Sequence, residues 1–233
     1  MKKEVAQAIE QLENGGFLMV FDKEGREEET DLVTPSITIT PSKVRRLRRD
    51  AGGLICVTIH PDTWKKLDLP LLHDLFDHSV EEYSILGHME ADDIPYDEKS
   101  TFSLTINHRD TCTGITDIDR ALTIKRFAEL GEEIKDVDPD KAKEMFGDEF
   151  RTPGHVFLLN ATEGLTKNRE GHTELTTALL TLTDVFPSMT ICEMLSSDGG
   201  SMSEDEAREY GKKHDIPLVE GKDIEEALED MDE

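Results

Sequence analysis

Acidic residues crowd the segment from Asp22 to Asp31, which directly follows the apolar run 17–21. Loops that follow buried strands often carry binding and catalytic groups. Carboxylate oxygens suit Mg²⁺ or Mn²⁺, provided that the loop curls, because alternate residues of an extended chain lie about 7 Å apart. Arg26 offers an ion-pair partner that would hold the acids in place. The alternative is a solvated acidic loop, which is common in so acidic a chain.

A second group of polar residues, 168–174 (NREGHTE), stands where the sequence predicts the start of a helix. Backbone N–H groups at a helix start, together with Arg169 and the Thr173 hydroxyl, would form a cradle for phosphate. His172 could coordinate a metal or contact the phosphate from the same turn. An ordinary helix capped by Thr173, with surface charges around it, is the alternative.

Two more residues have the chemistry of acid or base catalysts. His155 follows Pro153 and Gly154 on a predicted constrained turn, and an imidazole titrates near neutral pH. Glu193 ends the apolar run 189–192, where a carboxylate needs a partner to offset its desolvation. Each also has a structural explanation, as a loop histidine and as half of a buried ion pair.

The composition limits the classes of partner. The 233 residues include 26 lysines and arginines against 52 acids, so the net charge is −26 and should repel nucleic acids and anionic membranes. No window approaches the roughly 18 apolar residues of a membrane span, and the N-terminus lacks an apolar signal core. Cys56, Cys112 and Cys192 form no paired spacing, which favours reduced thiols in the cytoplasm.

The apolar pattern predicts one α+β domain over 1–233, with a mixed sheet surrounded by helices. The strands are expected at 17–21, 32–39, 54–59, 101–106, 156–159, 189–192 and, at an edge because of Pro217, 216–219. The helices are expected at 3–13, 43–49, 116–131, 173–184 and 203–213.

Three segments have no clear period. We expect a long functional or mobile loop from about Asp74 to Lys99. The charged segment 132–149 is expected to be a peripheral insertion, as a solvated surface excursion rather than a helix. The acidic tail 223–233 is expected to form one helix or to fray.

Five motifs together resemble the 3,4-dihydroxy-2-butanone 4-phosphate synthases, in particular their archaeal single-function form, over about residues 3–220. They are REEETD at 26–31, DAGGLIC at 50–56, TPGH at 152–155, NREGHTE at 168–174 and ICE at 191–193. The resemblance implies an α+β lyase of riboflavin biosynthesis that converts D-ribulose 5-phosphate to L-3,4-dihydroxy-2-butanone 4-phosphate and formate. It also implies a homodimer with shared active sites and Mg²⁺, usually as a pair. Because a histidine ligand such as His172 is softer than Mg²⁺ usually selects, Mn²⁺ could replace it.

The same resemblance assigns residues. Glu27 and His172 correspond to metal ligands, and His155 and Glu193 to catalytic residues, with Glu29 as a further acid or base. Substrate contacts are implied for Arg26, Glu27, Asp31, Thr113, Arg169, Glu170, Gly171, His172, Thr173 and Glu193.

The expected reaction proceeds through an enediol, loss of a hydroxyl, rearrangement of the carbon skeleton and loss of formate. Metal ions and acid–base side chains would stabilise the charge and move the protons of these steps. Two alternatives stay open on the residues alone. A sugar-phosphate isomerase or phosphatase would use the same carboxylates, and a degenerate phosphosugar-binding protein would bind without turnover.

The acidity leads to a prediction about salt. We interpret it as adaptation to a salt-rich cytoplasm, whereas the alternative is an ordinary acidic surface. Because salt screens repulsion among like charges, the melting temperature should rise between dilute buffer and molar KCl. Differential scanning calorimetry would measure this rise, and a constant melting temperature would contradict the interpretation.

Overall fold

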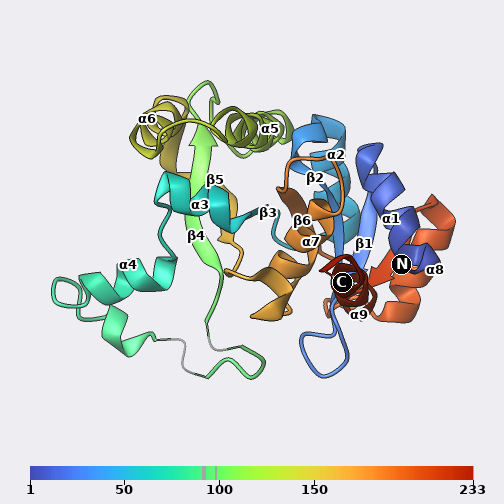
Figure 1. Cartoon of the computed structure of the whole chain (residues 1–233). Helices are drawn as coiled ribbons and strands as arrows, with labels where there is room; N and C mark the ends of the chain where they lie inside the picture. Colours follow the sequence, from blue (N-terminus) through green and yellow to red (C-terminus); the bar gives the residue numbers. More distant parts are fainter. Residues whose placement is uncertain (91–92, 98, 233) are drawn as a thin grey trace.

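The computed structural model describes residues 1–90, 93–97 and 99–232, and within them the strands form one seven-stranded mixed sheet (Figure 1). Two neighbouring pairs, β3 with β5 and β1 with β7, are parallel, and the other four are antiparallel. The α+β class is therefore confirmed. In sheet order the strands are β4 (Phe102–His108), β5 (Phe150–Asn160), β3 (Cys56–Ile59), β6 (Met189–Glu193), β2 (Thr30–Pro35), β1 (Leu18–Phe21) and β7 (Leu218–Glu220).

Helices cover both faces of the sheet, because successive strand side chains point to opposite faces. In β1, Leu18 and Val20 belong to one apolar cluster and Met19 to the other. The first cluster is completed by α1 (Lys3–Glu13), α7 (His172–Thr181) and α9 (Gly221–Asp232). The second is completed by α2 (Pro41–Arg46), α3 (Pro61–Leu67), α5 (Asp117–Glu133), α6 (Pro139–Glu149) and α8 (Glu204–His214).

Local signals placed several elements correctly. Helix α1 has the predicted bounds, and β7 lies at the sheet edge as Pro217 indicated. The Thr116 side chain accepts a hydrogen bond from the Asp119 amide at the start of α5, and Ser203 and Glu206 form a capping box at the start of α8. Among the described residues, no helix is both long and apolar enough to cross a membrane.

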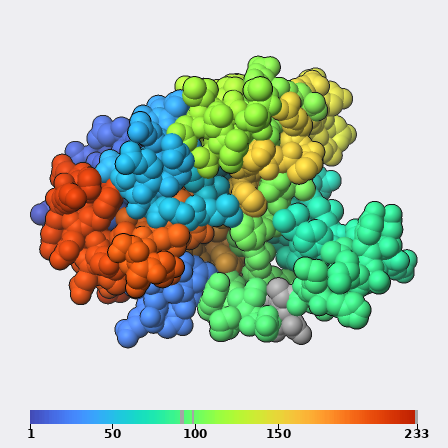
Figure 2. Space-filling model, turned by 180° about the vertical axis from the view of Figure 1, so that it is seen from behind, coloured from blue at the N-terminus to red at the C-terminus, as the bar shows by residue number. Residues whose placement is uncertain are grey.

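The segment from Asp74 to Lys99 is not the continuous loop that was expected. Its first residues belong to α4 (Leu72–Ser79), and a 3₁₀ turn follows at Leu86–His88, while 91–92 and 98 lie outside the described residues. Residues 72–90, which we call the arm, project from the body of the molecule (Figures 1 and 2). The helix was missed because none of its eight residues is buried. Its sequence therefore lacks the regular spacing of apolar residues that marks a helix packed on a core.

The charged segment 132–149 is also more ordered than expected. Its second half is α6, in which Ala142 is fully buried and the Phe146 ring lies 5.0 Å from that of Phe150. The expectation of a solvated excursion is therefore wrong for this half, because a few apolar side chains pack inward while the charges face solvent. The acidic tail forms α9, with Ile224 and Ala227 buried, and residue 233 lies outside the described chain.

The turn expected at 152–155 lies inside β5 instead. Val156 pairs with Ile106 and Arg151 with Asn107, so the four residues between them bulge from the β4–β5 ladder. A Cβ at Gly154 would overlap the Ile106 carbonyl, which explains why glycine stands there. The TPGH motif thus forms a bulge within a strand.

The packing of α6 can be tested by substitution. Ala142→Gln would force a longer polar side chain into a fully buried site, so we expect a loss of about 2–3 kcal/mol in the free energy of unfolding. Urea denaturation would measure it. The matched control is Lys143→Gln on the exposed side of the same helix, which should change stability by no more than about 0.5 kcal/mol. Equal effects of the two substitutions would show that α6 does not pack on the core.

Candidate active site

The acidic loop between β1 and β2 is curled around the buried carboxylate of Asp22. One Asp22 oxygen accepts the amide N–H of Glu27 at 3.0 Å, and the other accepts the amide N–H of Glu29 at 3.1 Å. The Arg26 guanidinium lies 3.4 Å from the first oxygen. The loop therefore has the curl that a metal site requires, and the residue that produces it is one to which the sequence assigned no role of its own.

A candidate metal centre lies where this loop meets the start of α7. Asp22, Glu27 and His172 each offer a ligand atom, and these atoms lie within 4.8 Å of one another. The Nδ1 atom of His172 is 3.2 Å from Glu27 Oε2. The two carboxylates suit Mg²⁺ or Mn²⁺, whereas the imidazole is a softer ligand than Mg²⁺ usually takes and favours Mn²⁺. The nearby buried Oδ1 of Asp31 has no hydrogen-bond partner in the described part of the chain, so a further oxygen donor is available.

The electrostatics of this corner favour a positive charge. Burial raises the pKa of Asp31 to about 7, with the carboxylates of Glu193 and Glu27 adding to the rise and His172 opposing it. Burial alone would lower the pKa of His172, but Asp31 and Glu27 outweigh it and raise that pKa to about 9. Burial likewise disfavours the charged form of Glu27, yet the hydrogen bond and charge of His172 hold its pKa below the usual value. The acidic loop therefore favours a positive charge beside it.

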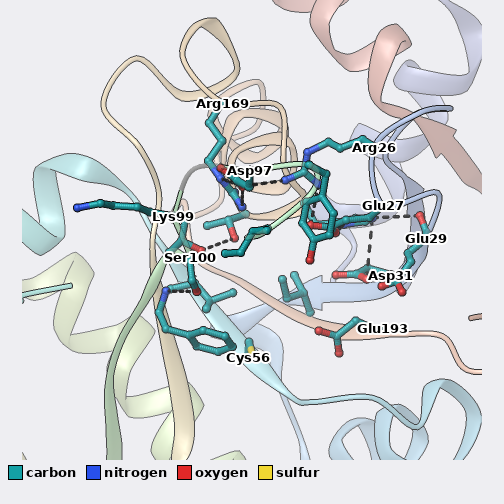
Figure 3. Close-up of a pocket in the computed structure, with 18 residues that line it drawn as sticks. Arg26, Glu27, Glu29, Asp31, Cys56, Asp97, Lys99, Ser100, Arg169 and Glu193 are labelled. Carbon is teal, nitrogen blue, oxygen red and sulfur yellow. Dashed lines mark hydrogen bonds and ion pairs between the residues drawn. The ribbon is translucent and has the colours of Figure 1, made fainter. Parts of the chain in front are cut away.

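One pocket of about 290 Å³ brings together most of the predicted site residues (Figure 3). Its walls come from the acidic loop, the start of α7, the end of β6 and the segment before β4. Cys56 also borders it, and burial raises the pKa of its thiol. The predicted residues in the pocket wall are Arg26, Glu27, Glu29, Asp31, Arg169, His172, Thr173 and Glu193.

Glu193 obtains its partner from the backbone rather than from a buried ion pair. It lies opposite Asp31 in the β2–β6 ladder, which places two carboxylates side by side on neighbouring strands. Its Oε2 accepts the amide N–H of Leu54 at 2.8 Å. A Cβ at Gly53 would overlap the Glu193 side chain, so the glycine of the DAGGLIC motif makes room for this carboxylate.

Arg26 and Arg169 point toward each other across the carboxylate of Asp97 (Figure 3). Asp97 Oδ2 is 2.7 Å from Arg169 Nε and 3.3 Å from Arg26 Nη2. On its other side, Arg169 pairs with the buried carboxylate of Glu174. Sequence reasoning missed Asp97, which lies in a stretch without periodicity, and it gave no role to Glu174, although that residue ends the NREGHTE motif.

Four predicted substrate or catalytic residues are not in the wall of this pocket. His155 is exposed on its bulge, where its Nδ1 is 3.1 Å from the Asn107 amide nitrogen. Thr113 is also exposed, and a Cβ at its neighbour Gly114 would overlap the same Asn107 side chain. His155 and Thr113 therefore share a second cluster around Asn107.

The other two residues lie close to the pocket without lining it. Glu170 pairs with Lys23 on the outer side. Gly171 is the N-cap of α7, and a Cβ there would overlap the Arg169 guanidinium and approach that of Arg26. Glycine at this position therefore lets both arginines reach the helix start.

Comparisons with known proteins agree over almost the whole chain. Residues 6–227 match the sequence model of the 3,4-dihydroxy-2-butanone 4-phosphate synthases. The synthase of Methanosarcina mazei is 45% identical over 96% of this chain and 90% of its own length. That of Archaeoglobus fulgidus is 43% identical over 94% of this chain and 92% of its own.

Solved structures of the same enzyme share the fold. The Candida albicans synthase is 30% identical with a TM-score of 0.73, and the match covers 96% of each chain. A synthase structure in complex with two magnesium ions is 25% identical with a TM-score of 0.76, and the match covers 98% of this chain and 97% of that one. Motifs, fold and relatives thus agree, and the chain belongs to the 3,4-dihydroxy-2-butanone 4-phosphate synthase family, lyases of riboflavin biosynthesis.

Proposed function

We propose that two copies of this chain form a Mg²⁺-dependent enzyme that converts D-ribulose 5-phosphate to L-3,4-dihydroxy-2-butanone 4-phosphate and formate. The observation that carries this proposal is the proximity of the Asp22, Glu27 and His172 cluster to Arg26 and Arg169 in one pocket. The related structure with two magnesium ions supports a pair of ions, and the mixed oxygen and nitrogen ligands would also accept Mn²⁺.

The proposed roles follow from the positions of the side chains. Bound metal would act as a Lewis acid that stabilises negative charge on the sugar oxygens. Glu29, Asp31 and Glu193 line the same pocket and would accept and return protons. Arg169 and Thr173, at the start of α7, would hold the phosphate and so position the reacting end of the sugar.

The separate cluster around Asn107 supports a shared active site. His155 and Thr113 are exposed and absent from the pocket wall of their own chain, so a second copy could bring them to it. Apolar side chains are exposed beside the Asn107 cluster and beside the pocket. Ile115 and Ile118 follow Thr113 in the first, and Leu54 and Leu195 flank Glu193 in the second. Such surfaces are typical of contacts between subunits. We infer a two-fold dimer in which each pocket receives His155 of the partner subunit.

The cellular setting is also part of the proposal. The unpaired cysteines favour the reducing environment of the cytoplasm. The net charge of −26 favours one with a high salt concentration and makes nucleic acid an improbable partner.

Metal removal tests the activity. The purified chain with ribulose 5-phosphate and Mg²⁺ should release formate, and a chelator should abolish the release until Mg²⁺ or Mn²⁺ is added. An enzymatic formate assay would measure this. Release of inorganic phosphate would instead identify a phosphatase, isomerised sugar without formate would identify an isomerase, and binding without turnover would identify a binding protein. Glu27→Gln should remove turnover while the chain still folds, because the loop carboxylate contributes little packing.

Mixed dimers test the shared site. Glu27→Gln and His155→Ala should each be inactive alone, because each damages both sites of its own dimer. Unfolding and refolding the two variants together at equal concentration should restore about a quarter of wild-type activity, since half of the dimers would be mixed and hold one intact site. Wild type carried through the same procedure is the control. No recovery in the mixture would place His155 with the pocket of its own chain.

A further inference from the structure

The Arg169 guanidinium is fully engaged by protein carboxylates. Its Nη1 lies 2.5 Å from Glu174 Oε2, and Glu174 is itself held by the Thr162 amide, whose N–H it accepts at 2.8 Å. The remaining edge of Arg169, formed by Nε and Nη2, lies 2.7 and 2.5 Å from Asp97 Oδ2. The edge that Arg169 would offer to a phosphate is therefore occupied by Asp97.

Arg26 reaches the same Asp97 oxygen from the opposite side. Its Nη2 lies 3.3 Å from that oxygen, while its Nη1 contacts the acidic loop at Glu27 and Asp22. The ring of Tyr96 lies 5.6 Å from the Arg26 guanidinium and covers it. Two arginines that converge on one anion form the arrangement that recognises a phosphate, and here the anion is a side chain of the protein.

Asp97 also borders two cavities. On one side is the carboxylate-lined pocket of Figure 3, and on the other is an outer groove of about 620 Å³. Lys23, Lys99 and Lys167 line the outer groove together with Glu170, which pairs with Lys23. The lysines still outnumber this acid, which is unexpected in so acidic a chain. An anionic substrate would be attracted to this groove and would meet the two arginines at its inner end.

We propose that the Asp97 carboxylate occupies the phosphate position between Arg26 and Arg169 while substrate is absent, so that an incoming phosphate must displace it. Asp97 is then a positioning residue that weakens substrate binding. When its carboxylate moves away from the arginines, the outer groove is connected to the pocket. This inference rests on the proposed role of Arg169 in binding phosphate. If Asp97 only held the two arginines in place, its loss would weaken phosphate binding. The proposal predicts the opposite, that loss of this carboxylate strengthens phosphate binding.

Phosphate affinity tests the proposal directly. Asp97→Asn removes the charge without changing the size of the side chain, so inorganic phosphate should bind about tenfold tighter than to wild type. Isothermal titration calorimetry of the full chain with Mg²⁺ would measure this. The matched control is Asp93→Asn, an exposed acid in the same segment with the same change of net charge, whose affinity should stay within about twofold of wild type. Unchanged or weaker binding by Asp97→Asn overturns the proposal.

Two more variants separate displacement from damage to the fold. Asp97→Glu keeps a carboxylate and should retain an affinity close to wild type, whereas Asp97→Ser should repeat the gain seen with Asp97→Asn. In turnover, Asp97→Asn should lower KM for ribulose 5-phosphate more than it changes kcat. Equal affinities for Asp97→Glu and Asp97→Ser would contradict the proposal.

The outcome does not depend on the assigned reaction. Tighter phosphate binding by Asp97→Asn, in a protein that releases no formate, would refute the proposed function and leave this inference intact. Formate release by wild type, without tighter binding by the variant, would refute this inference alone.

Discussion

The site depends on a single buried carboxylate at the end of a strand. Asp22 accepts amide hydrogen bonds from Glu27 and Glu29 and so bends an acidic segment that like-charge repulsion would otherwise extend. The bend brings the Glu27 carboxylate to the His172 imidazole at the start of α7. Elements far apart in the chain meet here, because β1, β2 and β6 are neighbours in the sheet and α7 packs on the same face as α1 and α9.

The sheet supplies the rigidity that such a concentration of charge requires. Asp31 is buried and Glu193 partly buried, and their carboxylates lie side by side on paired strands, where they would move apart if the backbone could relax. Two well-packed apolar clusters, one on each face, prevent that movement. The resulting cost in stability is localised at the site, and a bound cation would relieve it.

Much of the fold could be predicted from local signals. The bounds of α1, the capping box of α8 and the edge position of β7 follow from a few neighbouring residues each. Helix α4 could not be predicted in this way, since none of its residues is buried. Helix α6 was obscured because its charged residues outnumber the few apolar ones that pack.

The sequence predicted which residues belong to the site but not how they are placed relative to one another. Sequence motifs identified Arg26, Glu27, His172 and Glu193, which the fold brings into one pocket. They did not reveal that His155 lies apart from that pocket, because the β4–β5 bulge is a property of strand pairing. Nor did they indicate Asp97, whose two arginine partners lie about 70 residues away on either side.

The projecting arm has a consequence for how assembly and catalysis are connected. Five large apolar side chains of the arm are exposed, so the core does little to fix its orientation; they are Leu75, Phe76, Tyr83, Ile85 and Met89. A short stretch of chain joins this arm to Tyr96 and Asp97. A partner that bound the arm would restrict the movement of the chain that leads to Asp97. Binding at this distant surface would then change how readily Asp97 leaves the two arginines.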